Sequence, residues 1–248
     1  TGSTFSEPGT GNGNIGKDIY SFTHVSGDKL GKNLVVAEVL QSTKNDFANG
    51  GVGNATEFYG LYRRTFSFAK MTGKPVSFGP VKDVSLVGRL DLQTKNISFA
   101  PRAKKLIGGV SFDFEVPKGF VESGIYAYSE SNHFYVGAFP GGTGDVSFKT
   151  TYMLDTSWLI PFNAGTPAKW TGSLTYTGAK GKDGLSNDTK PETRLITTLM
   201  FDVGNHTGFA VGIGFEAWRN KYGNAPATTP VAGSTSHNTA LLLAEYRF

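Results

Sequence analysis

Aromatic and charged side chains recur at every second position in several segments of this chain, which is the spacing of one face of a β-strand. Glu57, Tyr59 and Arg63 share such a face, and Arg89 and Asp91 share another. Carboxylates, guanidinium groups and aromatic rings around one space can hold a small polar solute through hydrogen bonds and ring contacts. These residues therefore indicate reversible binding of a solute.

Catalysis and metal binding have weaker support in the sequence. His24, near Ser26, is the only one of the four histidines in a predicted strand, and no nucleophile motif surrounds a serine. The acidic stretch at 183–192 lacks the spacing of an EF-hand and contains lysines. There is no cysteine, which excludes disulfides and thiolate chemistry. We expect no enzyme activity, no metal and no cofactor, and an outer-membrane hydrolase is the less favoured alternative.

The elements that must position these residues are strands of period two. Clean alternation occurs at 83–93, 105–116, 148–158, 169–177, 194–203 and 209–218. These segments exceed the roughly 5 to 6 residues of an ordinary globular strand, and their charges lie opposite the apolar face. A soluble sheet with one buried face, or a lipocalin-like binder with an apolar interior, would show similar alternation. We predict instead an all-β fold, a closed antiparallel transmembrane β-barrel with lipid outside and a wet lumen inside.

Composition agrees with this class. Of the 248 residues 38% are hydrophobic, and no run approaches the roughly 18 to 20 apolar residues of a spanning helix. The 33 glycines and 13% aromatics suit barrel curvature and aromatic girdles. A net charge of +4 is too small to indicate nucleic-acid binding, although it favours anionic lipids or solutes.

The end of the chain has the pattern of a closing barrel strand. Apolar residues occupy every second position from Ala240 to Phe248, with Glu245 and Arg247 between them. A terminal aromatic after such a strand resembles the assembly signal of bacterial outer-membrane proteins. Phe248 is therefore predicted to engage the barrel-assembly machinery.

Residues 1–248 are predicted to form one barrel domain of twelve strands. Eleven strands are evident from about residue 17, and an even number with both termini periplasmic requires a further strand within 1–7, abbreviated or partly missing. Short turns are expected at 116–119, 160–167 and 203–208 on the periplasmic side. Long extracellular loops are expected at 43–54, 131–145, 178–191 and 222–238. The connection at 69–81 is long although strand parity assigns it to the periplasmic side.

Runs spread over nearly the whole chain resemble the Tsx family, the nucleoside-specific channels of the outer membrane of Gram-negative bacteria. One run is Gly50-Gly-Val-Gly-Asn-Ala-Thr-Glu-Phe-Tyr-Gly-Leu-Tyr-Arg63. The others lie at 5–8, 19–27, 72–75, 78–83, 181–184, 187–193 and 214–223. The resemblance is to the broad Tsx-like group. It implies a twelve-stranded barrel with a narrow channel for facilitated diffusion of nucleosides, and a second role as a surface receptor for phages or colicins.

A nucleoside pore needs aromatic faces for the base and charged groups for the sugar and the base edges. By strand parity the predicted lumen set is Phe22, His24, Glu57, Tyr59, Arg63, Arg89, Asp91, Asp113, Tyr126, Tyr128, Arg194, Glu216 and Trp218, with Tyr20 beside Phe22. The pattern of 120–130 leaves it ambiguous which face of this strand points outward. We expect the face without the two tyrosines to meet lipid, which places Tyr126 and Tyr128 in the lumen. In an alternative interpretation the charges brace the barrel as ion-pair ladders. The alternative function is a general small-solute channel, or a phage or colicin receptor barrel without nucleoside selectivity.

Overall fold

The computed structural model describes residues 3–5, 15–44, 54–96, 101–133, 144–203, 208–224 and 235–247. Most of them belong to strands. The strands are β1 (Ser3–Phe5), β2 (Ile15–Gly27), β3 (Gly31–Lys44), β4 (Thr56–Ser67), β5 (Val81–Lys95), β6 (Arg102–Phe114), β7 (Phe120–His133), β8 (Asp145–Ser147), β9 (Thr151–Asn163), β10 (Pro167–Thr177), β11 (Glu192–Asp202), β12 (Phe209–Arg219) and β13 (His237–Tyr246).

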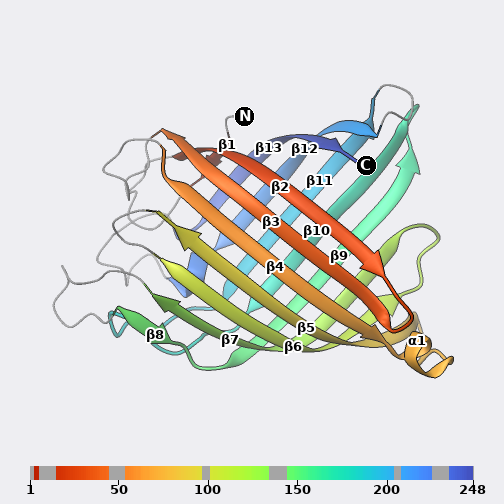
Figure 1. The fold of residues 1–248 in the computed structure, drawn as a ribbon, viewed down its shortest axis with the longest axis horizontal. Helices are drawn as coiled ribbons and strands as arrows, with labels where there is room; N and C mark the ends of the chain where they lie inside the picture. Colours follow the sequence, from red (N-terminus) through yellow and green to blue (C-terminus); the bar gives the residue numbers. More distant parts are fainter. Residues whose placement is uncertain are drawn as a thin grey trace.

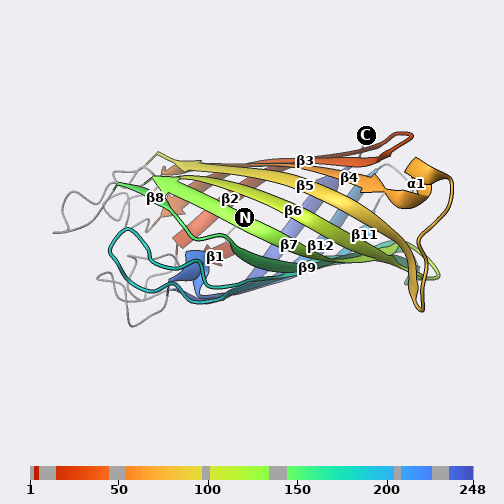
Figure 2. The same ribbon diagram turned by 90° about the horizontal axis from the view of Figure 1, so that it is seen from below.

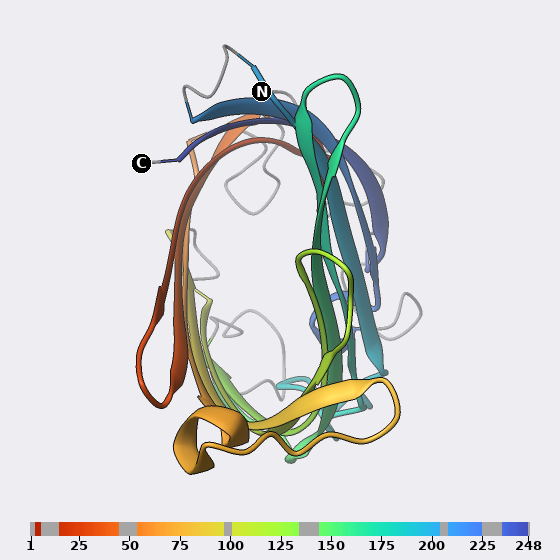
Figure 3. The same ribbon diagram turned by 90° about the vertical axis from the view of Figure 1, so that its right-hand side faces the viewer.

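The strands form one antiparallel sheet that curls into a barrel (Figure 1). Within the described residues twelve strands follow one another in hydrogen-bonded order, and the short β8 pairs with β7 outside this path. β1 lies beside β13, so the sheet closes into the ring seen end-on in Figure 3. The predictions of an all-β barrel and of twelve strands are confirmed, and β1 supplies the strand expected within 1–7.

The two faces of the sheet differ in chemistry as the alternation predicts. On the outer face Leu106 and Ile125 are 66% and 55% exposed. On the inner face Asp91 and Tyr126 are 3% and 4% exposed. Directly opposed residues of antiparallel strands share a face, so the register carries this division from strand to strand. The predicted arrangement, with apolar side chains outside and ionic ones inside, is confirmed.

The face prediction for β2 was wrong. Ser21 pairs with Glu38, which pairs in turn with Tyr59, so these three side chains point into the barrel. Phe22 and His24 therefore lie on the outer face, where Phe22 is 49% exposed. Neither residue lines the lumen, and His24 is no candidate for chemistry there.

The error has a physical cause in the composition of β2. Ile19 and Val25 face inward, whereas Tyr20 and Phe22 face outward, so both faces of this strand carry large apolar side chains. Alternation fixes the phase of a strand only when its two faces differ in polarity. On β2 they do not differ, and only pairing with β3 sets the phase.

The barrel has a short-turn end and a long-loop end. The strand ends that flank 28–30, 115–119, 164–166 and 203–208 lie at the short-turn end. The strand ends that flank 45–55, 96–101, 134–144, 178–191 and 220–236 lie at the other end. α1 (Phe68–Thr72) lies at the short-turn end and β8 at the long-loop end (Figure 2). This division matches the predicted alternation of short and long connections. No helix in the described part of the chain is long and apolar enough to cross a membrane.

The long connection at the short-turn end is ordered by two residues. Ser67 caps α1 by accepting a hydrogen bond from the backbone N–H of Lys70 at 3.1 Å. The carboxylate of Asp83, at the start of β5, accepts from the Ser67 hydroxyl at 2.6 Å and from the Ala69 N–H at 3.2 Å. The connection at 69–81, expected to be long, therefore contains a short capped helix.

The last strand agrees with the predicted closing strand. On β13 Leu242 and Tyr246 point outward and are 69% and 63% exposed. Phe248 lies outside the described residues, so its predicted role in assembly stays a prediction.

Candidate functional site

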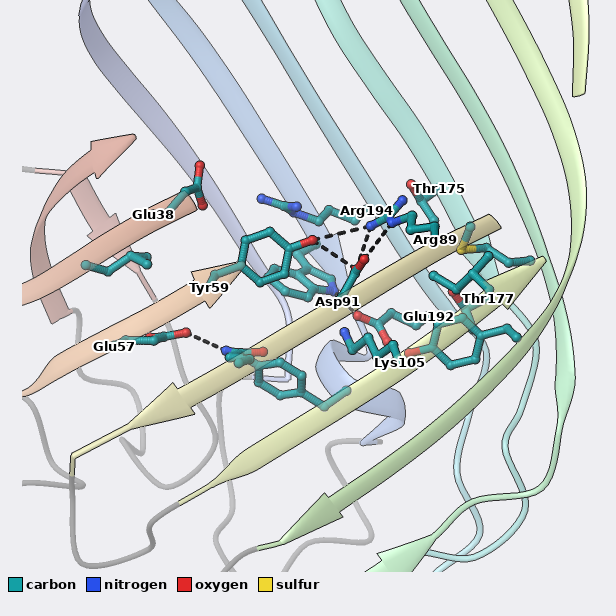
Figure 4. Close-up of a pocket in the computed structure, with 17 residues that line it drawn as sticks. Glu38, Glu57, Tyr59, Arg89, Asp91, Lys105, Thr175, Thr177, Glu192 and Arg194 are labelled. Carbon is teal, nitrogen blue, oxygen red and sulfur yellow. Dashed lines mark hydrogen bonds and ion pairs between the residues drawn. The ribbon is translucent and has the colours of Figure 1, made fainter. Parts of the chain in front are cut away.

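A cavity of about 140 Å³ that opens to solvent lies inside the barrel (Figure 4). Its walls come from strands all around the ring. The lining residues are Glu38, Leu40, Glu57, Tyr59, Arg89, Asp91, Gln93, Lys105, Ile107, Tyr128, Met153, Thr175, Thr177, Glu192, Arg194, Trp218 and Tyr222.

One side of the cavity is a fixed polar triad from β4 and β5. Arg89 donates to both oxygens of Asp91, from Nε to Oδ1 at 2.7 Å and from Nη2 to Oδ2 at 2.7 Å. The Tyr59 hydroxyl donates to Asp91 Oδ2 at 2.9 Å, and Arg89 Nη2 donates back to it at 3.3 Å. Because Asp91 accepts three of these bonds and is nearly buried, its role is to orient the tyrosine and the arginine. The Tyr59 ring then presents a rigid aromatic surface to the cavity.

Glu57 sits on the same strand as Tyr59, nearer the long-loop end. Its carboxylate pairs with Lys17 Nζ at 3.0 Å and accepts from Gln93 Nε2 at 2.5 Å. Glu57 and Lys17 are nearly buried. This pair braces β2 against β4, and the amide of Gln93 lines the cavity beside it.

Arg194 faces the triad from the opposite wall (Figure 4). Its Nη2 donates to Glu216 Oε2 at 3.0 Å, and His237 Nε2 lies 2.8 Å from the other oxygen of that carboxylate. The Arg194 side chain is 40% exposed, whereas that of Glu216 is 5% exposed. Glu216 therefore anchors the guanidinium at one edge and leaves the rest of it facing the cavity.

Trp218 is already surrounded by other groups. Its Nε1 donates to Glu192 Oε1 at 2.6 Å. The centre of its ring lies 4.9 Å from the guanidinium of Arg194 and 4.6 Å from Lys221 Nζ. A flat solute would have to displace a cation to stack on this ring. Trp218 lines the cavity as predicted, but it is better placed to hold cations than to stack on a solute.

Lys105 is a second cation of the cavity with unused bonding capacity. It lies directly opposite Asp91 in the β5–β6 register. Among the residues that the structure describes, its ammonium makes no hydrogen bond or ion pair. Two carboxylates also keep capacity. In the described ranges Glu38 accepts only from the Ser21 hydroxyl, at 3.1 Å, and Glu192 accepts only from Trp218. The cavity thus offers both free donors and free acceptors.

A second charged cluster crosses the barrel nearer the short-turn end. Glu122 of β7 binds Lys32 Nζ at 2.7 Å and the guanidinium of Arg63. Arg63 Nη2 also donates to the Tyr126 hydroxyl at 3.2 Å, and Asp113 lies 3.8 Å from Lys32. These contacts connect β3 and β4 with β6 and β7 through the interior, as the bracing interpretation predicts.

The predicted set therefore divides three ways. Glu57, Tyr59, Arg89, Asp91, Tyr128, Arg194 and Trp218 line the cavity. Arg63, Asp113, Tyr126 and Glu216 face the barrel interior away from it. Phe22 and His24 lie on the outer face. The inward phase chosen for Tyr126 and Tyr128 is confirmed, since both are 4% exposed.

Several lining residues were not among the predicted binding residues. Strict alternation could have found two of them. Lys105 shares the inward parity of Asp113 within 105–116, and Glu192 shares that of Arg194 when 194–203 is extended two residues toward the N-terminus. The same holds for Gln93, two residues after Asp91. Tyr222 follows β12 in the 3-10 turn η2 (Lys221–Gly223), where no period-two signal exists.

No protein-family model matches the chain, and no curated protein matches it. The resemblance to the Tsx family therefore rests on the sequence runs alone. In the described part of the chain, no group of three or more His, Cys, Asp or Glu side chains is placed to hold a metal ion.

Proposed function

We propose that the protein is a channel of the bacterial outer membrane through which small polar solutes, and nucleosides in particular, diffuse. The observation that carries the proposal is the open cavity, lined by charged and aromatic side chains, inside a barrel whose outer face is mainly apolar. A barrel of this polarity suits a bilayer around it and water within it. The Tsx resemblance of the sequence supports the same class of solute.

The chemistry of the cavity matches the parts of a nucleoside. Tyr59 offers a ring held in place by Asp91, and a base can lie against it. Lys105 and Arg194 can donate to base carbonyls and ring nitrogens, whereas carboxylates such as Glu192 can accept from ribose hydroxyls. The opening to solvent favours the weak binding and rapid release that conduction requires.

The test is solute flux into liposomes that contain the purified protein. We expect nucleosides to enter faster than sugars of the same size, because sugars lack the flat base. Equal rates would reduce the protein to a general small-solute channel. Rates equal to those of protein-free liposomes would show that it is no channel.

A matched pair of variants on β4 tests the site itself. Tyr59→Ala removes a ring from the cavity, whereas Tyr62→Ala removes a ring from the outer face of the same strand, where Tyr62 is 48% exposed. We expect the first variant to lower the preference for nucleosides over sugars by about two- to thirteenfold, since one ring contact contributes roughly 0.5–1.5 kcal/mol. The second variant should keep the preference. Equal preference in the two variants would remove Tyr59 from the site.

A further inference from the structure

The outer face of β5, β6, β7 and β8 carries polar and charged side chains in register near the long-loop end. One row across the strands is Leu92, Lys104, Ser131 and Ser147. The next row toward the long-loop end is Thr94, Arg102, His133 and Asp145. The row nearer the middle of the barrel, on the same outer face, is Leu90, Leu106 and Ser129. Elsewhere this face is mainly apolar.

The two cations of these rows are not compensated. Lys104 and Arg102 are exposed, and within the described ranges neither makes a hydrogen bond or an ion pair. The carboxylate of Asp145 lies 2.7 Å from His133 Nδ1. Arg64, an outward-facing cation near the other end, is by contrast bound to Asp28. Uncompensated cations side by side on the outer wall repel each other unless an anion lies between them.

A hollow of about 170 Å³ opens beside Lys104. The hydroxyl-bearing residues on its walls are Ser129, Ser131 and Ser147, and none of these hydroxyls makes a hydrogen bond within the part of the chain described here. An ammonium group with several free hydroxyl donors is a suitable set of partners for a phosphate group, which presents only acceptor oxygens and negative charge at neutral pH.

We propose that this surface, formed by Lys104, Arg102 and the three serines, binds the phosphate of a membrane lipid headgroup. The apolar row argues for a lipid over free phosphate. Leu90 and Leu106 are 42% and 66% exposed on the same outer face. They lie next to the cations on the side toward the middle of the barrel, where the acyl chain of a lipid would run. The proposal rests on the barrel lying in a membrane, as the proposed function requires.

The test is a titration of the detergent-solubilised protein with lipid A, a glycolipid that carries two phosphates, followed by native mass spectrometry. The double variant Lys104→Gln/Arg102→Gln should bind about 25-fold more weakly, since each cation near anionic headgroups contributes roughly fivefold. The control Lys74→Gln/Lys118→Gln removes the same charge at the short-turn end and should bind as the unaltered protein does. Equal affinity in the two double variants would overturn the proposal.

Two further arms separate the sources of phosphate and the roles of the protein. Inorganic phosphate at the same concentration should not displace lipid A, and full displacement would assign the surface to free phosphate instead. Lys104→Arg should retain lipid binding, because it retains the charge, and its failure would also count against the site. Solute flux should be unchanged in Lys104→Gln/Arg102→Gln, so loss of lipid binding and failure of the channel function are distinguishable.

Discussion

Lys180 Nζ lies 2.6 Å from Glu130 Oε2, and the two side chains are 1% and 2% exposed. The pair connects residues 178–191, at the long-loop end, with the inner face of β7. The ammonium of Lys180 also lies 4.4 Å from the centre of the Phe148 ring, and the Tyr128 hydroxyl donates to Glu130 at 2.5 Å. Because Tyr128 lines the cavity, this buried pair ties the connection to a residue of the candidate site through Glu130.

Lys180→Met should release residues 178–191 from the barrel wall. The substitution leaves the Glu130 carboxylate buried without its cation, and the loss of one partner of such a pair costs roughly 3–5 kcal/mol. Local opening is then favoured over the ordered connection. Hydrogen–deuterium exchange over 178–191 should rise by at least about tenfold, since about 1.4 kcal/mol corresponds to a factor of ten.

Lys182→Met is the matched control for this experiment. Lys182 pairs with Asp188 in the same connection, but the two side chains are 63% and 74% exposed, and an exposed pair contributes little. Exchange over 178–191 should stay as in the unaltered protein. A similar rise in the two variants would mean that the buried pair is not what holds the connection.

Arg63→Ala should weaken the barrel more than it changes solute selectivity. Arg63 and Lys32 both bind Glu122 across the interior, so the variant leaves that nearly buried carboxylate with one cation. We expect the free energy of unfolding to fall by about 2–4 kcal/mol, measured by urea unfolding in detergent. Arg63→Lys should recover part of it. If unfolding is unchanged while solute flux changes, Arg63 belongs to the binding site and not to a brace.

The turn that joins β2 and β3 should keep its structure well into the acid range. Arg64 donates to both oxygens of Asp28 at 2.8 and 3.0 Å, and the N–H groups of Leu30 and Gly31 donate to Oδ1. The guanidinium of Arg64, followed by the N–H of Leu30, holds the pKa of Asp28 well below its usual range. A lowered pKa means that this stabilisation is complete above the usual carboxyl pKa of about 4 and is lost only at lower pH, as Asp28 takes up a proton.

Amide protection at Leu30 and Gly31 should therefore be constant from neutral pH to about pH 4 and fall only in stronger acid. The measurement is NMR of the protein in detergent micelles, with protection corrected for the intrinsic pH dependence of exchange. Asp28→Asn should lack this acid transition, because it has no proton to gain. A transition near pH 4 to 5 in the unaltered protein would contradict the ion pair with Arg64.

Alternation predicts which face a residue takes when the two faces of its strand differ. On β5 Arg89 and Asp91 alternate with Leu90 and Leu92, and the phase is unambiguous. On β2 both faces are apolar, so Phe22 was assigned to the wrong side. The fold class follows from the pattern of the whole chain, which one ambiguous strand does not change.

The candidate site was only partly predictable for a different reason. Strand parity places Tyr59 and Arg194 inside the barrel, but it does not say that they face each other across one cavity. That depends on ring closure and on the heights of strands far apart in sequence. Contacts such as that of Lys180 with Glu130 join a connection to a strand 50 residues away, and no local pattern encodes them.

Two glycines on the outer face should respond to alanine in opposite ways. At Gly172 an added methyl group would lie 2.4 Å from Cζ2 of Trp158, its partner in the β9–β10 register, and 2.6 Å from the carbonyl oxygen of Ile196. At Gly88, also central in a strand, the same group would meet nothing within 4 Å. Gly172→Ala should therefore destabilise the barrel by about 1–3 kcal/mol, as overpacking does. Gly88→Ala should be neutral or stabilise it by up to about 1 kcal/mol, because alanine loses less backbone freedom on folding than glycine. The midpoints of urea unfolding in detergent measure both effects. Equal midpoints in the two variants would show that the Trp158 ring does not depend on the space above Gly172.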